Sequence, residues 1–146
     1  MDRKEFLSNL GLGLAVVCTG GCLASCSKSS DTDSSTGGTT PTPPTNVNFT
    51  VDLGNEIKNI GDSVTKSGVI VVRLAQGNAI GSFTAVQVAC THQGTAINFN
   101  NAQGNFICPN HGSQFTTSGT VLNGPATTNL KKYTIAISGS TMTVTA

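Results

Sequence analysis

From residue 47 onward, apolar and polar residues follow one another in short segments separated by turn residues. Residues 49–53 (Phe-Thr-Val-Asp-Leu) have the two-residue period of a strand with one buried face. Residues 69–74 form a nearly continuous apolar run between two glycine-containing turns. The pattern predicts a strand in each of these segments and a further strand at 80–89.

The remaining apolar segments continue this pattern to the end of the chain. Residues 105–108 predict a short strand that follows a hairpin turn at 100–104 (Asn-Asn-Ala-Gln-Gly). Residues 132–137 and 141–145 predict a terminal hairpin around a Ser-Gly-Ser turn. Only a turn near 56–60 is a candidate for helical structure. We therefore expect an all-β fold, either an antiparallel β-sandwich or a small open barrel.

Composition and charge agree with one β-rich domain at residues 47–146. Val, Ile and Thr dominate its apolar segments, and only 10% of the residues of the chain are charged. A segment of this length supports a modest hydrophobic core. The formal net charge of +1 gives no basic surface of the kind that nucleic-acid binding requires, so we expect no nucleic-acid partner.

The first residues of the chain have the features of an export signal. Two basic residues, Arg3 and Lys4, precede a short apolar run that is rich in Gly and Ala and ends at Cys26. A membrane span needs about twenty apolar residues, so this run predicts a signal peptide at 1–25. Its end, Leu-Ala-Ser-Cys, resembles a bacterial lipobox. That resemblance implies lipidation of Cys26 and an exported protein anchored on the periplasmic or cell-surface side of the membrane.

Three alternatives concern the same segment. It could remain as an uncleaved membrane anchor instead of a signal peptide. A lipobox ending at Cys22 fits less well, because Thr19 stands where Leu is wanted. The sequence Arg-Lys-Glu-Phe-Leu at 3–7 resembles a twin-arginine signal with Lys in place of the second Arg, and an ordinary basic segment for general secretion is the alternative.

A linker is predicted between the lipidated cysteine and the domain, at residues 26–46. Its residues are mostly Ser, Thr, Pro, Gly and Asp, with no large apolar side chain. Such a segment cannot bury enough apolar surface to offset its ordering entropy, so we expect it to be disordered. At about 5–6 Å per square-root residue its mean reach is about 25 Å. It would act either as a tether that lets the domain swing or as a passive spacer above the lipid headgroups.

Two Cys–His pairs mark the candidate site of the domain. Cys90-Thr-His92 and Cys108-Pro-Asn-His111 contain both histidines of the chain and its only cysteines beyond residue 26. Two thiolates and two imidazoles can hold a [2Fe–2S] cluster in which His replaces Cys on one iron. They can also form a tetrahedral zinc site, although zinc sites usually pair Cys with Cys and His with His.

The residues around these pairs resemble the two cluster-binding boxes of Rieske iron–sulfur proteins. The matching segments are Cys-Thr-His-Gln-Gly at 90–94 and Cys-Pro-Asn-His-Gly-Ser at 108–113. The resemblance implies a Rieske-type fold with two cluster-binding loops and one [2Fe–2S] cluster per chain. The implied ligands are Cys90, His92, Cys108 and His111, with the two imidazoles exposed at the tip of the domain.

The same resemblance assigns roles to neighbouring residues. Gly94 and Gly112 stand beside the ligands, where the backbone passes close to the cluster. Ser113 matches a serine that donates a hydrogen bond to a bridging sulfide, and Phe115 stands where high-potential members carry a Tyr. Pro125, in Gly-Pro-Ala, resembles the proline loop that covers the cluster; an ordinary Gly-Pro turn is the alternative.

Two positions separate this chain from the Rieske subunits of quinol-oxidising complexes. Those subunits carry one extra Cys in each box, joined as a disulfide, whereas Thr95 and Asn110 stand at these positions here. The chain is more similar to the disulfide-free, ferredoxin-type members. Rieske centres span about −150 to +300 mV, and we expect a value in the middle of this range.

Three functions remain open from the sequence. The first is a lipid-anchored carrier that transfers one electron between redox partner proteins. The second is a Rieske subunit of a quinol-oxidising or other respiratory complex, with a cytochrome as partner. The third is a non-redox lipoprotein stabilised by zinc. Both histidines are used by the candidate site, so we expect an electron-transfer protein or oxidoreductase subunit and no stand-alone enzyme.

Overall fold

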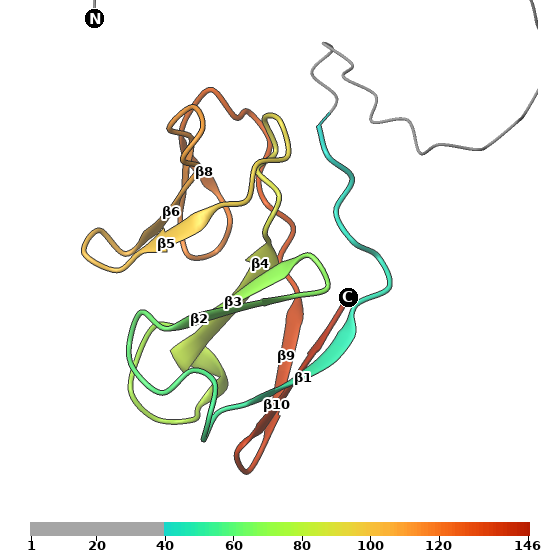
Figure 1. Cartoon of the computed structure of the whole chain (residues 1–146), viewed down its shortest axis with the longest axis vertical. Coiled ribbons are helices and arrows are strands. Elements are labelled where there is room, and N and C mark those ends of the chain that lie inside the picture. The colour runs from blue at the N-terminus through green and yellow to red at the C-terminus, as the bar shows by residue number, and fades with distance from the viewer. Residues whose placement is uncertain (1–39) are drawn as a thin grey trace, which may run out of the picture. The chain divides into compact units, whose positions relative to one another are not determined.

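The computed structural model describes residues 40–146, which form ten β-strands and one 3₁₀ turn (Figure 1). The predicted signal peptide, Cys26 and the linker up to residue 39 lie outside the described residues. The strands are β1 (Asn48–Asp52), β2 (Ser63–Lys66), β3 (Val69–Arg73), β4 (Phe83–Gln87), β5 (Asn98–Asn100), β6 (Asn105–Ile107), β7 (Gln114–Phe115), β8 (Val121–Asn123), β9 (Thr134–Ser138) and β10 (Thr141–Thr145). The turn is η1 (Ile80–Ser82).

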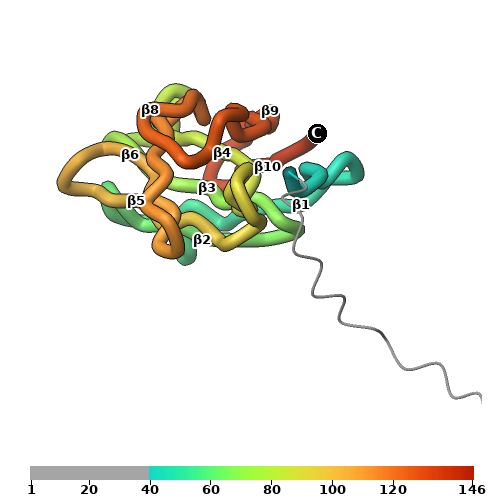
Figure 2. Tube along the Cα trace, turned by 90° about the horizontal axis from the view of Figure 1, so that it is seen from above, coloured from blue at the N-terminus to red at the C-terminus, as the bar shows by residue number. Residues whose placement is uncertain are grey.

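The strands form three antiparallel sheets, which confirms the predicted all-β, antiparallel fold. Their orders are β1-β10-β9, β2-β3-β4 and β5-β6-β7-β8. Seen from above, the sheet of β5 to β8 lies on one side of the molecule and β1, β9 and β10 lie on the other (Figure 2). Among the described residues, no helix is long and apolar enough to cross a bilayer.

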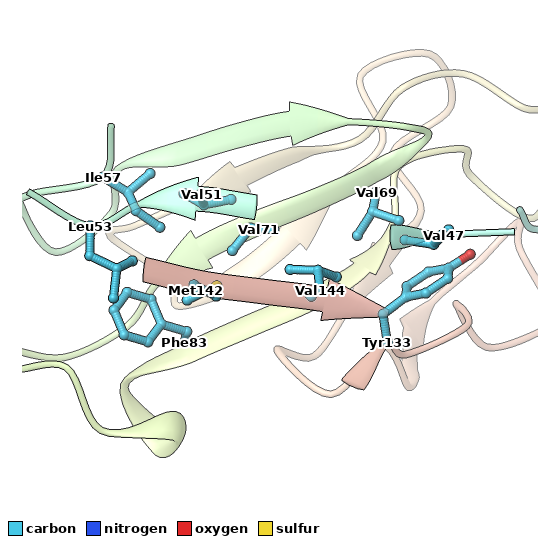
Figure 3. Close-up of a cluster of buried hydrophobic side chains, with 11 residues drawn as sticks. Val47, Val51, Leu53, Ile57, Val69, Val71, Phe83, Tyr133, Met142 and Val144 are labelled. Carbon is cyan, nitrogen blue, oxygen red and sulfur yellow. The ribbon is translucent and has the colours of Figure 1, made fainter. Parts of the chain in front are cut away.

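A first core lies between the sheet of β1, β10 and β9 and the sheet of β2, β3 and β4 (Figure 3). Its side chains come from alternate positions of the paired strands, as the two-residue period of a half-buried strand requires. The buried members are Val47, Val51, Leu53, Ile57, Val69, Val71, Phe83, Ala85, Tyr133, Met142 and Val144.

Strand β3 separates this core from a second one. Val69 and Val71 belong to the first core, whereas Ile70 and Val72 belong to the second. Successive side chains of a strand point to opposite faces, so β3 is buried on both. This two-sided burial explains the nearly continuous apolar run at 69–74, because each buried aliphatic side chain contributes about 1.5–3 kcal/mol.

The second core lies under the sheet of β5 to β8 and reaches the candidate site. Phe106 on β6 and Phe115 on β7 are direct cross-strand partners, and neither side chain is exposed. Cys90 and Cys108 are members of the same buried cluster. The two boxes are therefore positioned by a core of their own, built on the far face of β3 and β4.

The observed strands differ from the predicted ones in two ways. The segment 80–89 was expected to be one strand, but its first residues form η1, and Ile80 is 59% exposed. The turn forms because the Ser82 N–H donates to the Ala79 carbonyl, so extended pairing begins only at Phe83. Four strands were not predicted, namely β2, β5, β7 and β8, because each has only two to four residues.

The predicted turns and the terminal hairpin agree better with the structure. The turn at 100–104 connects β5 to β6, and the segments at 132–137 and 141–145 correspond to β9 and β10, which pair as a hairpin. The candidate helical turn near 56–60 is not a helix. Single hydrogen-bonded turns occur there, such as the 2.8 Å bond from the Glu56 N–H to the Asp52 carbonyl.

Residues 41–46 were assigned to the disordered linker, but they lie against the domain. The Tyr133 hydroxyl donates to the Pro44 carbonyl at 2.9 Å. Pro41 lies beside Gly94, where an added Cβ would be 3.8 Å from the proline ring. The segment therefore runs from the first box down to β1, as the cyan trace in Figure 1 shows.

Gly68→Ala is expected to destabilise the domain and to displace this segment. Gly68 has φ +74°, and an added Cβ would lie 2.8 Å from Pro44 Cγ. The left-handed backbone costs an alanine about 1–2 kcal/mol, and the contact with Pro44 adds to this. Urea unfolding measures the loss. The control is Gly77→Ala, at φ +86° with no atom within 4 Å; equal losses in both variants would show that the Pro44 contact is unimportant.

Candidate metal centre

The first box is a closed loop that follows β4. The Cys90 N–H donates to the Thr95 carbonyl, and the Gly94 N–H donates back to the Cys90 carbonyl, both at 2.8 Å. Gly94 has φ +79°, a conformation that favours glycine, and it lets the chain turn back within five residues. His92 projects from the middle of this loop and is half-buried.

The second box repeats this arrangement between β6 and β7. The Cys108 N–H donates to the Ser113 carbonyl at 2.8 Å, and the Gly112 N–H donates to the Cys108 carbonyl at 3.0 Å. Gly112 has φ +76°. In both loops the cysteine is the first residue and the glycine is the fifth. The histidine is the third residue of the first loop and the fourth of the second, where His111 is exposed.

The structure brings the four predicted ligands together as two pairs. Cys90 and Cys108 are buried free thiols close enough to share a hydrogen bond. Nδ1 of His92 lies 3.2 Å from Nδ1 of His111, with the ring planes at 82°. Metal–imidazole bonds of about 2.0–2.1 Å in a tetrahedral site separate two nitrogens by roughly 3.3 Å. The observed separation of the two nitrogens is compatible with their binding one metal ion.

This pairing suits a group with two metal ions better than a single ion. Within residues 40–146, no three His, Cys, Asp or Glu side chains are grouped around one point. A tetrahedral zinc ion needs all four donors at one point. A [2Fe–2S] cluster with two His ligands needs a thiolate pair on one iron and an imidazole pair on the other. The donors present fit that cluster.

Burial raises the pKa of the Cys90 thiol, because the surrounding core disfavours the thiolate. The backbone N–H of His92 lowers this pKa by hydrogen bonding to the sulfur, whereas the neighbouring Cys108 raises it. A bound cation neutralises the thiolates, so we expect metal binding to release their protons.

Ser113 is fully buried and connects the second box to the 124–126 loop. Its Oγ accepts a hydrogen bond from the Ala126 N–H at 3.0 Å. The hydroxyl keeps its own hydrogen, and a hydrogen bond to Cys90 sulfur lowers the pKa of that thiol. The predicted position of Ser113 beside the ligands therefore agrees with these contacts.

The loop around Pro125 is attached to both boxes. Ser113 connects it to the second box, and the Thr91 hydroxyl in the first box donates to the Thr128 carbonyl at 2.6 Å. Pro125 itself is exposed and follows a cis peptide bond. The three loops lie at the same end of the molecule (Figure 1).

Sequence reasoning missed three of the residues that hold the site together. The hydrogen bond from the Thr91 hydroxyl to the Thr128 carbonyl attaches the first box to the loop around Pro125, and these two residues are 37 positions apart. The buried Gln87 side chain accepts a hydrogen bond from the Lys131 N–H and donates to the Ala89 carbonyl, just before the first box. In the sequence, only Thr91 could have been noticed, because it lies between two candidate ligands.

Phe115→Tyr is expected to raise the midpoint potential. Phe115 is fully buried in the hydrophobic cluster that contains Cys90 and Cys108, and it stands where high-potential members of the family carry a Tyr. A hydrogen bond to a charged sulfur stabilises the reduced state. Potentiometric titration measures the shift. Phe99→Tyr, on β5, is the control and should leave the potential unchanged; an unshifted Phe115→Tyr would show that this ring does not face a ligand sulfur.

Comparison with known proteins identifies the Rieske family, but the curated relatives in this comparison are cytochrome b6-f subunits and not the ferredoxin-type members expected from the sequence. The family described as "Rieske [2Fe-2S] domain" matches residues 48–134. The cytochrome b6-f complex iron-sulfur subunit of Prochlorococcus marinus is 34% identical over 97 residues, which cover 53% of this chain and 54% of that protein. The Cyanothece subunit of the same name is 33% identical over 106 residues, covering 64% and 58%. The chain thus spans about half the length of these curated relatives.

Solved structures of related proteins share the fold. The crystal structure of the plasma membrane Rieske protein from Synechocystis superimposes with a TM-score of 0.51 and 37% identity, covering 65% of this chain and 92% of that one. The ferredoxin of carbazole 1,9a-dioxygenase from Nocardioides aromaticivorans has a TM-score of 0.51 at 18% identity and covers 70% of this chain and 98% of that one. At 18% identity, the similarity to this ferredoxin is evidence for the fold alone.

Proposed function

This chain belongs to the Rieske [2Fe–2S] domain family and carries one such cluster, and from this premise we propose that it is a one-electron carrier. The proposed ligands are Cys90, Cys108, His92 and His111. The observation that carries the proposal is the arrangement of these donors as a buried thiol pair and a converging imidazole pair. When bound, the cluster takes up and gives back a single electron.

Different residues of the site contribute to electron transfer in different ways. The buried cysteines keep water away from one side of the site, and the exposed His111 puts the other side in reach of a partner. The backbone N–H of His92 and the Ser113 hydroxyl direct hydrogen-bond donors at the Cys90 sulfur, which favours negative charge on it. The hydrogen bonds that close the two loops restrain these groups.

Spectroscopy of the purified full chain tests this function. We expect two irons and two acid-labile sulfides per chain, and after reduction an EPR signal with the low average g value of His-ligated clusters. The matched control is the double variant His92→Ala with His111→Ala, which should lack this signal. A colourless protein that holds one zinc ion would overturn the electron-transfer function and support the zinc alternative.

The proposal extends to export and lipid anchoring at Cys26. It is supported by the lipobox-like sequence before this residue and by the name of the Synechocystis relative, a plasma membrane Rieske protein. Mass spectrometry of the membrane fraction should find a diacylated N-terminal cysteine. Cys26→Ala should abolish the modification and Cys22→Ala should not; the reverse result would move the anchor to Cys22.

A second candidate function is that of a subunit in a cytochrome complex. The observation in its favour is that several relatives are named cytochrome b6-f complex iron-sulfur subunits. Solubilisation from native membranes followed by size fractionation separates the two functions. Co-migration of the chain with a b-type cytochrome would favour the subunit, and migration as a free chain would favour the carrier.

A further inference from the structure

Strand β9 lies at the end of its sheet, and one of its edges has no partner strand. The sheet has the order β1-β10-β9, so β10 occupies the other edge of β9. Just before β9 the chain is attached to β4, where the Tyr133 N–H donates to the Ala85 carbonyl at 2.9 Å. Beyond this bond, no strand among residues 40–146 pairs with the outer edge of β9.

This free edge carries backbone N–H groups and carbonyls that point away from the sheet. In an antiparallel sheet, the backbone groups of successive residues point alternately to one side of the strand and to the other. The Tyr133 N–H points toward β4, so the backbone groups of Ile135 and Ile137 point to that same outer side. The groups of the residues between them point to β10, which pairs with β9 along its whole length.

Several other edge strands have features that discourage pairing with another chain. Lys66 on β2 donates from its Nζ to the Thr50 carbonyl of β1 at 3.1 Å, so a charged side chain lies against β1. Strands β5 and β8 have three residues each. Charged side chains, prolines, bulges and short length are the usual means of blocking an edge. Strand β9 has five residues without charge or proline, and its register with β10 shows no bulge.

We propose that β9 pairs antiparallel with β9 of a second copy of this chain, with Ala136 at the centre of the pair. The sequence of the strand, Thr-Ile-Ala-Ile-Ser, has the same alternation of polar and apolar residues in both directions. When the two Ala136 residues lie opposite each other, each Ile135 lies opposite an Ile137. Every outward N–H group and carbonyl of the two strands then has a partner, as buried backbone groups require.

The side chains also suit this register. The central pair is one whose residues exchange no hydrogen bonds, and such pairs have the closer Cα spacing of about 4.5 Å. Ala136, with its small exposed side chain, occupies this position. Ile135 and Ile137 are half-buried against the first core, and they meet across the pair on that same face. Apolar cross-strand pairs of this kind stabilise a sheet.

A groove leaves space beside the first part of the free edge. It has a volume of about 430 Å³, and its lining includes Ile135 of β9, Phe83 of β4 and Ile80 of η1. Ile80 is 59% exposed, and a strand added to β9 would cover this apolar side chain. A pair of five-residue strands buries less surface than the roughly 1,200–2,000 Å² of stable interfaces, so we expect a weak dimer. The proposed lipid anchor would favour it by concentrating the chain at the membrane.

Analytical ultracentrifugation of the purified full chain in a density-matched detergent measures this association. We expect a monomer–dimer equilibrium in which the dimer fraction rises with concentration up to about 1 mM. Ala136→Lys places two ammonium groups directly opposite each other and should weaken the dimer several-fold. Thr65→Lys adds the same charge at an exposed residue of β2, and as the control it should leave the dimer unchanged.

Cysteine cross-linking tests the register. In the proposed pairing only the central residue lies opposite its own counterpart, so Ala136→Cys should give a disulfide-linked dimer in a glutathione redox buffer. Ser138→Cys is the matched control, because Ser138 is exposed on the same face two residues away and lies opposite Thr134. It should cross-link several-fold less. Mass spectrometry of the linked peptides verifies that the introduced thiols form the disulfide.

The inference is overturned by a wild-type chain that stays monomeric over the whole concentration range. A dimer that Ala136→Lys leaves intact would overturn it as well, because the copies would then associate through another surface. Equal cross-linking of the two cysteine variants would contradict the register centred on Ala136. None of these outcomes bears on the proposed electron-transfer function, since β9 contains no proposed ligand and the EPR signal tests that function separately.

Discussion

Cys108→Ala is expected to give a folded, colourless protein without a [2Fe–2S] cluster. The cysteine pair supplies two of the four proposed ligands, and no other cysteine is present among the described residues to replace one of them. Removing one thiolate leaves an iron site incomplete, and incomplete sites lose most of their affinity because ligands and metal are bound cooperatively. Absorbance, iron content and sulfide content measure the loss.

The fold should survive this substitution. Cys108 belongs to the second core, and removing its sulfur from a buried position costs on the order of 1–2 kcal/mol. The first core does not contain this residue. Asn110→Ala is the matched control, because Asn110 is an exposed residue in the same loop and should retain full iron. Full iron content in Cys108→Ala would contradict the proposed ligand set.

The candidate site could be located from the sequence because histidine and cysteine are rare in its domain. Only two histidines are present, and each follows a cysteine by two or three residues in a short box. The structure adds what spacing alone could not give. It shows that both boxes close with the same hydrogen bonds, and that the donors are sorted into a thiol pair and an imidazole pair.

The supporting contacts could not be predicted because they join distant parts of the chain. The bond from Thr91 to Thr128 spans 37 residues, and the bond from Tyr133 to Pro44 spans 89. Local composition predicted disorder for residues 41–46, since a Pro- and Thr-rich segment cannot form a core of its own. Tertiary contacts with the first box and with Tyr133 override that preference.

The fold was predictable at the level of class, and less so for its individual strands. The nearly continuous apolar run at 69–74 indicated a strand, and only the structure shows that its two faces belong to two cores. Strands β7 and β8 have two and three residues, too few for a period to be recognised. Their place is fixed by the boxes and turns around them rather than by their own sequence.

Ser113→Ala is expected to lower both the stability of the domain and the midpoint potential of the cluster. Without the hydroxyl, the buried Ala126 N–H loses its acceptor, which costs about 1–3 kcal/mol. A hydrogen bond to a charged sulfur is worth about 1.5–3 kcal/mol, of which only part depends on the redox state. About 1.4 kcal/mol corresponds to 59 mV for one electron, so the potential should fall by tens of millivolts.

Thr91→Ala separates the effect on the stability of the domain from the effect on the midpoint potential. Thr91 attaches the same loop through its bond to the Thr128 carbonyl, but no contact of its hydroxyl with a ligand sulfur is found in the described structure. We expect a comparable loss in urea unfolding and an unchanged midpoint potential. Equal shifts in potential for both variants would contradict a direct role of Ser113 and would show that loop attachment sets the potential. A shift confined to Ser113→Ala would assign the effect to the hydrogen that Ser113 donates toward Cys90.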